Sequence, residues 1–349
     1  MFAQSLALYR ELDDGWGKSL ALSWLGTVAR LQGAYGEARR LLEECLTISQ
    51  VLGDQRRVAW SMAKLAHVAT RQGRLEKAEL LARDSTARSQ KLGHREMTTY
   101  GLHVLGETLE ALARFAEARS VLEECLAISN ELGRRGFAAD AHAMLGSVNL
   151  HLGQYGQART HAETGLALAR ETNRRVRIGH TLLLLGNVAL AEEVYPEAQR
   201  LLRESVAVYR ETEQPDDIAR ALAISAYAAR GLGQRAQARG YLASALRTVA
   251  EIGVPMPLLY GLPALALLLA DRGGRVRAVE LHGLASRYPI VAQSRWFEDV
   301  AGRHIAAVAA SLPPDVVAAA EERGPARDLE ATATELLVEL EEMEGADDG

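Results

Sequence analysis

A forty-residue period runs through most of this chain and limits it to folds that are built by stacking similar units. Leucines recur at this step at Leu25, Leu65, Leu105, Leu145 and Leu185, and Leu265 lies two periods further on. Alanines recur at the same step, without a gap, at Ala38, Ala78, Ala118, Ala158, Ala198, Ala238 and Ala278. A period of this length is typical of repeat arrays, so we expect a solenoid and not a set of independent globular domains.

Each unit reads as two helices joined by a tight turn. In residues 56–91, for example, an apolar helical pattern (helix A) ends at Gly73 and a second one (helix B) follows it. Glycine fits such a turn because it adopts a positive φ at no steric cost. Ala, Leu, Arg and Glu are abundant and favour helix, whereas alternating β-branched runs typical of strands are missing. The sequence therefore predicts an all-α fold.

The repeated positions resemble the tetratricopeptide signature. A Leu-Gly pair lies in helix A, a glycine occupies the turn, an aromatic residue follows two positions later (Tyr35, Phe115, Tyr155, Tyr195), and a small Ala38-type residue lies in helix B. The usual period of that family is about 34 residues, so this chain is similar to its longer-helix variants. The resemblance implies a right-handed α-solenoid of about seven tetratricopeptide-like helical hairpins, followed by a non-repeating helical C-terminal cap.

The register of the repeat predicts the domain boundaries. Residues 1–287 form the repeat solenoid, residues 288–343 the helical cap and residues 344–349 an acidic disordered tail. Within the solenoid, a lone B helix spans 1–14. The hairpins are expected near 16–53, 56–93, 96–133, 136–173, 176–213, 216–253 and 257–287.

Both ends of the array are informative. Ser5–Glu11 repeats the pattern of Ser205–Glu211, so the chain opens on a B helix without an A helix before it. We therefore expect the polypeptide, or a partner, to continue upstream. After residue 287 the period stops, and the remaining sequence predicts three more helices, with Pro314 in a first helical turn and Gly324-Pro325 as a stop signal. The run SRWFEDVAGRHIAA also resembles the C-terminal end of large bacterial regulators with tetratricopeptide sensor arms.

Charge and hydropathy exclude several classes of function. The net charge is −5 and the pI is about 6.0, so the basic excess of a nucleic-acid-binding protein is missing. No run approaches the roughly 18 apolar residues of a membrane span, and no signal peptide is evident, so we expect a cytoplasmic protein without a membrane partner. The acidic residues Glu339, Glu341, Glu342, Glu344, Asp347 and Asp348 are expected to form a solvated tail.

No catalytic or cofactor motif is present. The sequence lacks a phosphate-binding loop, a dinucleotide-binding glycine motif, HExxH and CxxC, so we expect a non-enzyme without cofactor or metal. His103, Glu107 and Glu110 share a helix face and are candidate metal ligands, but a solvated groove is the favoured interpretation. Cys45 and Cys125 occupy one helix-B position two periods apart, where small size explains both. An enzyme in the tail would rest on Glu298, Asp299 and His304, which fit ordinary helix-surface positions.

The candidate binding surface is the concave face of the A helices. Counted from the repeat leucine, positions −5, −2, +2, +5 and +6 lie on one helical stripe, which varies between units. We call this set the inner stripe. Its candidate partner-binding residues are Trp60, His67, Arg71, Tyr100, His103, Glu107, Asp140, His180, Asn187, Arg220, Tyr227 and Arg230.

Some of these residues carry specific expectations. Trp60 and Tyr100 are the expected hot spots, unless a register one residue off places them in the core. Asn187 resembles the asparagine that holds ligand backbone in related arrays. Arg220 and Arg230, with Tyr227, are suited to an acidic segment.

Two functions are compatible with these features. The favoured one is a non-catalytic protein- or peptide-binding module, the ligand-sensing or interaction arm of a bacterial regulator, whose partners are a segment in the concave groove and an upstream effector domain. The alternative is a constitutive scaffold or oligomerisation subunit without a ligand response. The resemblance itself favours the first.

Overall fold

The computed structural model describes residues 2–253 and 256–347, with side chains described as far as residue 340. In these residues every regular element is a helix, which confirms the predicted all-α fold of tetratricopeptide-like hairpins. The helices group into two compact units, residues 1–145 and 146–349, and the boundary falls inside one helix.

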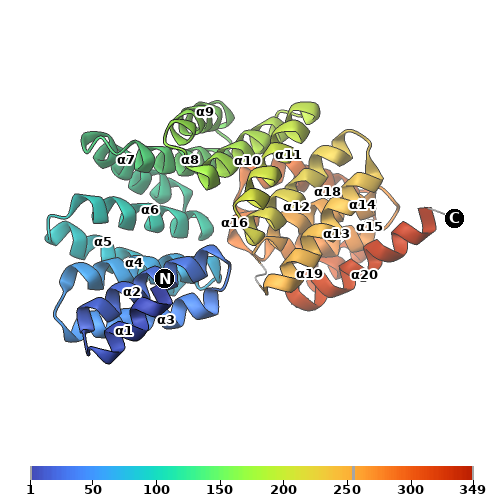
Figure 1. The fold of residues 1–349 in the computed structure, drawn as a ribbon. Coiled ribbons are helices and arrows are strands. Elements are labelled where there is room, and N and C mark those ends of the chain that lie inside the picture. The colour runs from blue at the N-terminus through green and yellow to red at the C-terminus, as the bar shows by residue number, and fades with distance from the viewer. Residues whose placement is uncertain (1, 254–255, 348–349) are drawn as a thin grey trace. The chain divides into compact units, whose positions relative to one another are not determined.

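The first unit consists of one single helix followed by hairpins of nearly uniform length (Figure 1, blue to green). Its helices are α1 (Phe2–Glu11), α2 (Gly15–Leu31), α3 (Tyr35–Val51), α4 (Gln55–Arg71), α5 (Leu75–Lys91), α6 (Arg95–Ala111), α7 (Phe115–Glu131) and most of α8 (Arg135–His151). The even-numbered ones are the A helices and the odd-numbered ones the B helices. The predicted lone B helix is thus α1.

The second unit continues the repeats and adds the C-terminal segment (Figure 1, green to red). Its repeat helices are α9 (Tyr155–Glu171), α10 (Arg175–Ala191), α11 (Tyr195–Glu211), α12 (Pro215–Gly231), α13 (Arg235–Ile252), α14 (Leu258–Ala270) and α15 (Arg275–Ser286). Even numbers again mark A helices.

The turns between helices explain the regularity of the repeat. Every twentieth residue from Asp13 to Gly273 has a positive φ, between +50° and +92°. Nine of these fourteen positions hold glycine, and the others hold Asp13, Ala113, Asn173, Glu193 and Glu213. The half-period of twenty residues is therefore one helix of 17 residues plus a three-residue turn whose middle residue is left-handed.

Small residues let the two helices of a hairpin approach closely. A Cβ added to Gly106 would lie 2.5 Å from Leu122, and one added to Gly186 would lie 2.8 Å from Leu202. The seven periodic alanines, from Ala38 to Ala278, are all fully buried. The small size of the residues at these positions therefore follows from hairpin packing, as the sequence predicted.

The segment after the last hairpin differs in part from the expected three helices. It begins with short pieces, α16 (Pro289–Ala292), α17 (Arg295–Phe297), the π-helical turn η1 (Glu298–Gly302) and α18 (Arg303–Ala309). Two longer helices follow, α19 (Pro314–Ala326) and α20 (Leu329–Asp347). Pro314 begins α19 as predicted, and the helix ends two residues beyond Gly324. At Gly324 an added Cβ would lie 2.4 Å from the carbonyl oxygen of Glu280, so α19 packs closely on α15.

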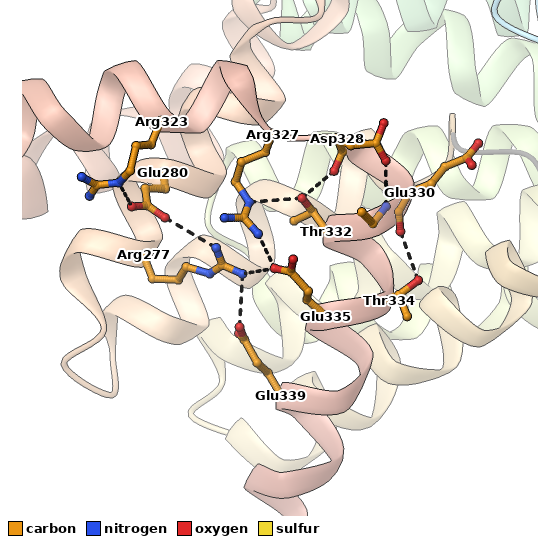
Figure 2. A network of polar contacts seen from close by, with 11 residues as sticks. Arg277, Glu280, Arg323, Arg327, Asp328, Glu330, Thr332, Thr334, Glu335 and Glu339 are labelled. Atoms are coloured by element: carbon orange, nitrogen blue, oxygen red, sulfur yellow. Dashed lines mark hydrogen bonds and ion pairs between the residues drawn. The ribbon is translucent and has the colours of Figure 1, made fainter.

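A polar network joins α15 to the last two helices (Figure 2). Arg323 donates to Glu280 at 2.6 Å, and Arg277 contacts Glu335 at 3.0 Å and Glu339 at 3.2 Å. The expectation that Glu339 belongs to a solvated tail is therefore wrong, because the Arg277 guanidinium holds it against the last repeat. Helix α20 also includes residues 344–347 of the predicted disordered tail, whereas residues 348 and 349 lie outside the described residues.

Candidate functional site

The inner stripe of the first unit brings two aromatic rings together. Trp60 of α4 and Tyr100 of α6 occupy the same position in consecutive repeats, and their ring centroids lie 4.9 Å apart. Both side chains are half-buried. They therefore present a paired aromatic surface and are not enclosed in the core.

A buried lysine lies beside this pair. The Lys64 ammonium donates to the carbonyl and hydroxyl oxygens of Ser23, at 3.2 and 2.9 Å, and to the Thr27 hydroxyl at 2.8 Å. It also lies 5.3 Å from the Trp24 ring and 5.4 Å from the Trp60 ring. Burial lowers the pKa of Lys64 to about 8. Sequence reasoning missed this residue, because it occupies a packing position (−1) where other repeats carry apolar side chains.

One helical turn beyond Lys64, a carboxylate is surrounded by cationic and imidazole groups. Glu107 of α6 lies 3.3 Å from Nε2 of His67 and 4.0 Å from Nη1 of Arg71, both on α4. Burial opposes ionisation of Glu107, but the facing His67, Arg71, His103 and Arg30 outweigh it and lower the pKa of this carboxyl. The residue is therefore an anion at neutral pH.

The imidazole of His67 stays neutral in this setting. Burial lowers its pKa to about 3, and the nearby Arg30 and Arg71 add to that effect, although Glu107 opposes it. With Nε2 facing the carboxylate, the neutral ring has Nδ1 left as an acceptor. Nδ1 is buried and has no hydrogen-bond partner among the described residues. This nitrogen is thus an unused acceptor beside a buried anion.

His103 and Asp140 complete the predicted set in this unit. His103 is buried on α6, close to Glu107 and His67. Asp140 of α8 is buried, 6% exposed, and its charge acts on Tyr100 and Cys125. In the described residues no three His, Cys, Asp or Glu side chains are arranged to hold a metal ion, and this includes the candidate set His103, Glu107 and Glu110.

In the second unit the inner stripe is covered by the chain itself. Trp296 of α17 is fully buried, and its indole N–H donates to the carbonyl oxygen of Asn187 in α10 at 2.9 Å. Its ring lies 5.8 Å from that of Tyr227 in α12, and the neighbouring Phe297 lies 5.3 Å from Tyr260 in α14. The segment Pro289–Ala309 thus packs across three consecutive A helices.

Polar contacts fix this segment along its length. Ser294 bonds through its hydroxyl to Nδ1 of His151 at 2.7 Å, and Asp299 accepts a hydrogen bond from the Tyr155 hydroxyl at 2.6 Å. Arg303 pairs with Glu193 at 2.5 Å. Burial lowers the pKa of His151 to about 3. Asp299, considered above for catalysis in the tail, therefore has a structural role here.

In the second unit, the side chains predicted to bind a partner all contact other residues of the same chain. Tyr227 donates to the carbonyl oxygen of Tyr260 at 3.0 Å, and Asn187 is buried beneath Trp296 with no partner for Oδ1 among the described residues. His180 lies 3.0 Å from Asp217, which also pairs with Arg220. Arg230 donates to both oxygens of Asp271, at 2.8 and 2.9 Å. The carboxylates of Asp217 and Asp271 thus occupy the place expected for an acidic partner.

The two cysteines share a hydrogen-bonding position. The thiol of Cys45 donates to the carbonyl oxygen of Ser19 at 3.1 Å, and that of Cys125 to Thr99 at 3.4 Å. Ser85 and Ser205, at the same position of other repeats, also donate to the carbonyl 26 residues earlier. Both thiols are free and buried. The structure therefore assigns them a packing role and adds a hydrogen bond that size alone did not predict.

No helix in the described part of the chain is both long enough and apolar enough to span a bilayer. A family model described as tetratricopeptide repeat matches residues 18–91 and 96–171. No curated protein sequence shows significant similarity to this chain.

Solved structures resemble the fold at low sequence identity. A Rap protein complexed with competence and sporulation factor is 15% identical, with a TM-score of 0.61 over 84% of this chain and 77% of its own. A Rap conjugation gene regulator of plasmid pLS20, in complex with the Phr* peptide, is 12% identical, with a TM-score of 0.61 over 86% and 78%. The apo form of RapI is 14% identical, with a TM-score of 0.58 over 79% and 97%. At these identities the likeness concerns the fold.

Proposed function

Because this chain carries tetratricopeptide repeats, we propose that it is a non-catalytic protein- or peptide-binding module whose ligand lies on the inner stripe of α4 and α6. The observation that carries the proposal is the gathering of Trp60, His67, Arg71, Tyr100 and Glu107 on two adjacent A helices. In the second unit, by contrast, the chain's own segment covers the inner stripe.

The chemistry of this surface suits an extended peptide. Two half-buried rings offer a flat apolar contact for an aliphatic or aromatic side chain. The Glu107 carboxylate, whose side chain is 18% exposed, is an acceptor that matches the N–H groups of a peptide backbone.

One structure with a similar fold supports a peptide as the ligand class, because the Rap conjugation gene regulator is in complex with the Phr* peptide. A second Rap protein is complexed with competence and sporulation factor. We extend this ligand class to the present chain on the strength of the shared fold. We further propose that the chain is the sensing arm of a bacterial regulator, acting in the cytoplasm. An attached effector domain would respond when the ligand favours one arrangement of the repeats.

Selection of peptides from a random displayed library on the immobilised full chain tests the site. The affinity of a selected peptide would then be measured by calorimetry. Trp60→Ala and Tyr100→Ala are each expected to weaken binding by about tenfold or more, because ring truncation at a hot spot costs about 2 kcal/mol. Glu107→Gln is expected to weaken binding without unfolding the chain.

Matched controls lie on the outer helices of the same unit. Glu123→Gln changes an exposed carboxylate on α7, and Leu80→Ala truncates an exposed apolar side chain on α5. Neither is expected to change the affinity. If the selected peptides bound all the inner-stripe variants as tightly as the unchanged chain, the site on α4 and α6 would be wrong.

A further inference from the structure

Arg30 of α2 is a half-buried arginine that has no carboxylate beside it in the described residues. It lies on the inner stripe, five residues after the repeat leucine Leu25. Within the part of the chain that the structure describes, its guanidinium forms no hydrogen bond and no ion pair. Removing a charge from water costs free energy unless an opposite charge or hydrogen bonds compensate for it. An anion that bound at Arg30 would therefore recover this cost.

The groups on which the charge of Arg30 acts lie on the following A helices. Burial lowers the pKa of Lys64 to about 8 and that of His67 to about 3, and the charge of Arg30 adds to both effects. Burial raises the pKa of Glu107 on α6, and Arg30 is among the cations that lower it. The guanidinium therefore lies towards α4 and α6, on the side of the proposed peptide site.

The second unit shows what the chain places beside an arginine at this position. Among the seven A helices, only α2 and α12 carry arginine at position +5. Arg230 of α12 donates to both carboxylate oxygens of Asp271, at 2.8 and 2.9 Å. Two parallel bonds of this kind form one of the stronger polar contacts in proteins. The two side chains are 28% and 23% exposed, so the contact lies within reach of solvent.

In the first unit an arginine replaces the carboxylate of this pair. Asp271 is at position +6, directly after the A helix that follows α12, and the same position of α4 holds Arg71. The Arg71 guanidinium lies 4.0 Å from the Glu107 carboxylate, and its side chain is 19% exposed. The charges of Arg30 and Arg71 act on the same His67 and Glu107. Both arginines therefore border one region of the inner stripe, and the chain supplies no counterpart of Asp271 there.

We propose that the bound peptide supplies this missing carboxylate, which lies between Arg30 and Arg71 in the place that corresponds to Asp271. The inference rests on the proposed function, because it concerns the peptide that binds to α4 and α6. The carboxylate belongs to an Asp or Glu side chain of the peptide or to its C-terminus.

The length of α4 sets where the carboxylate lies in the peptide. Trp60 and Arg71 are eleven residues apart on this helix. At about 1.5 Å per residue the separation is about 16 Å, which is the reach of about five residues of an extended peptide. The aromatic pair Trp60 and Tyr100 would hold an apolar side chain of the peptide. We therefore expect that side chain and the carboxylate to be about five residues apart.

Synthetic peptides test the proposal. Binders would be selected on the immobilised full chain from a library displayed with a free C-terminus. Each would be made in three forms: unchanged, with a C-terminal amide, and with Asp and Glu replaced by Asn and Gln. In calorimetry, one of the two altered forms is expected to bind about tenfold more weakly or worse, because it loses a charge-assisted pair. The form that loses affinity identifies the source of the carboxylate.

Variants of Arg30 show whether this arginine is the partner. Arg30→Gln should weaken the unchanged peptide by about the same factor, and removing the carboxylate from the peptide should then cause little further loss. Arg30→Glu should weaken it more, because it places a carboxylate of the chain in the site. Arg40→Gln is the matched control: it removes the same charge from an exposed position on α3, so the affinity should not change. Circular dichroism would check that each variant is folded.

The outcomes separate this inference from the proposed function. If Trp60→Ala weakened binding but Arg30→Gln did not, or if neither altered form of the peptide lost affinity, the carboxylate site would be wrong and the peptide site on α4 and α6 would stand. If no selected peptide responded to Trp60→Ala or Tyr100→Ala, the peptide site itself would be wrong, and this inference would fail with it.

Discussion

Trp296 donates its indole N–H to the backbone carbonyl oxygen of Asn187, 109 residues earlier in the chain. The bond places a fully buried indole on the inner stripe of the second unit, between Tyr227 and Phe297. The A helices there thus form part of the folded core together with the segment that follows the last hairpin.

Replacing this indole should destabilise the second unit. Trp296→Ala is expected to cost about 3–5 kcal/mol, as for other large aromatic side chains truncated in a core. Trp296→Phe keeps a ring but loses the donor to Asn187, so it should cost less. Chemical denaturation followed by circular dichroism would measure both. If the alanine variant unfolded at the same denaturant concentration as the unchanged chain, the segment would not be part of the folded core.

The turn positions yield a stabilising substitution. Glu213 has a φ of +52°, in the left-handed region that glycine adopts without strain. Glu213→Gly is expected to raise the free energy of unfolding by up to about 1 kcal/mol, since the left-handed conformation costs other residues about 1–2 kcal/mol. Glu123→Gly, in the interior of α7, should lower it by about 1 kcal/mol. Thermal unfolding of both variants would measure the two changes in stability. If both variants changed the stability equally and in the same direction, the left-handed conformation of Glu213 would not be the cause.

The regular part of the fold could be predicted from sequence because its signals are local and recur. Gly73 marks a turn, Gly106 and Ala118 mark close helix packing, and each has counterparts forty residues away. The position of Trp296 could not be predicted, because a single contact between residues 109 positions apart leaves no periodic trace. Lys64 was missed for a related reason: its position carries apolar side chains in the other repeats, and only the facing Ser23 and Thr27 explain it.

The shared position of the cysteines predicts which replacements are tolerated. Cys125→Ser keeps a donor toward the Thr99 carbonyl and matches Ser85 and Ser205, so it should change the free energy of unfolding by less than about 1 kcal/mol. Cys125→Leu should cost about 1–3 kcal/mol by overpacking. Denaturant unfolding of both variants provides the measurement. If both variants lost the same free energy of unfolding, neither the hydrogen bond nor the size of the side chain at this position would decide which replacements are tolerated.

The buried His151 should make the stability of the second unit depend on pH. Burial lowers its folded-state pKa to about 3, whereas the unfolded chain has a value of about 6.5. Between these values the unfolded state binds a proton that the folded state does not, so stability falls as the pH is lowered from 6.5 towards 3. From pH 7 to pH 5 the loss from this residue should be about 2 kcal/mol.

His151→Gln should reduce that slope, because glutamine does not titrate, although the variant also changes the contact with Ser294. Comparing the slope of the unfolding free energy against pH, and not its value at one pH, separates the two effects. The imidazole signals of His151 in NMR spectra should also remain those of a neutral ring at pH 5. If the His151 imidazole instead titrated near pH 6.5 in the folded chain, its protonation would not disrupt the contact between Ser294 and α8. Any acid sensitivity of the second unit would then have to come from other groups.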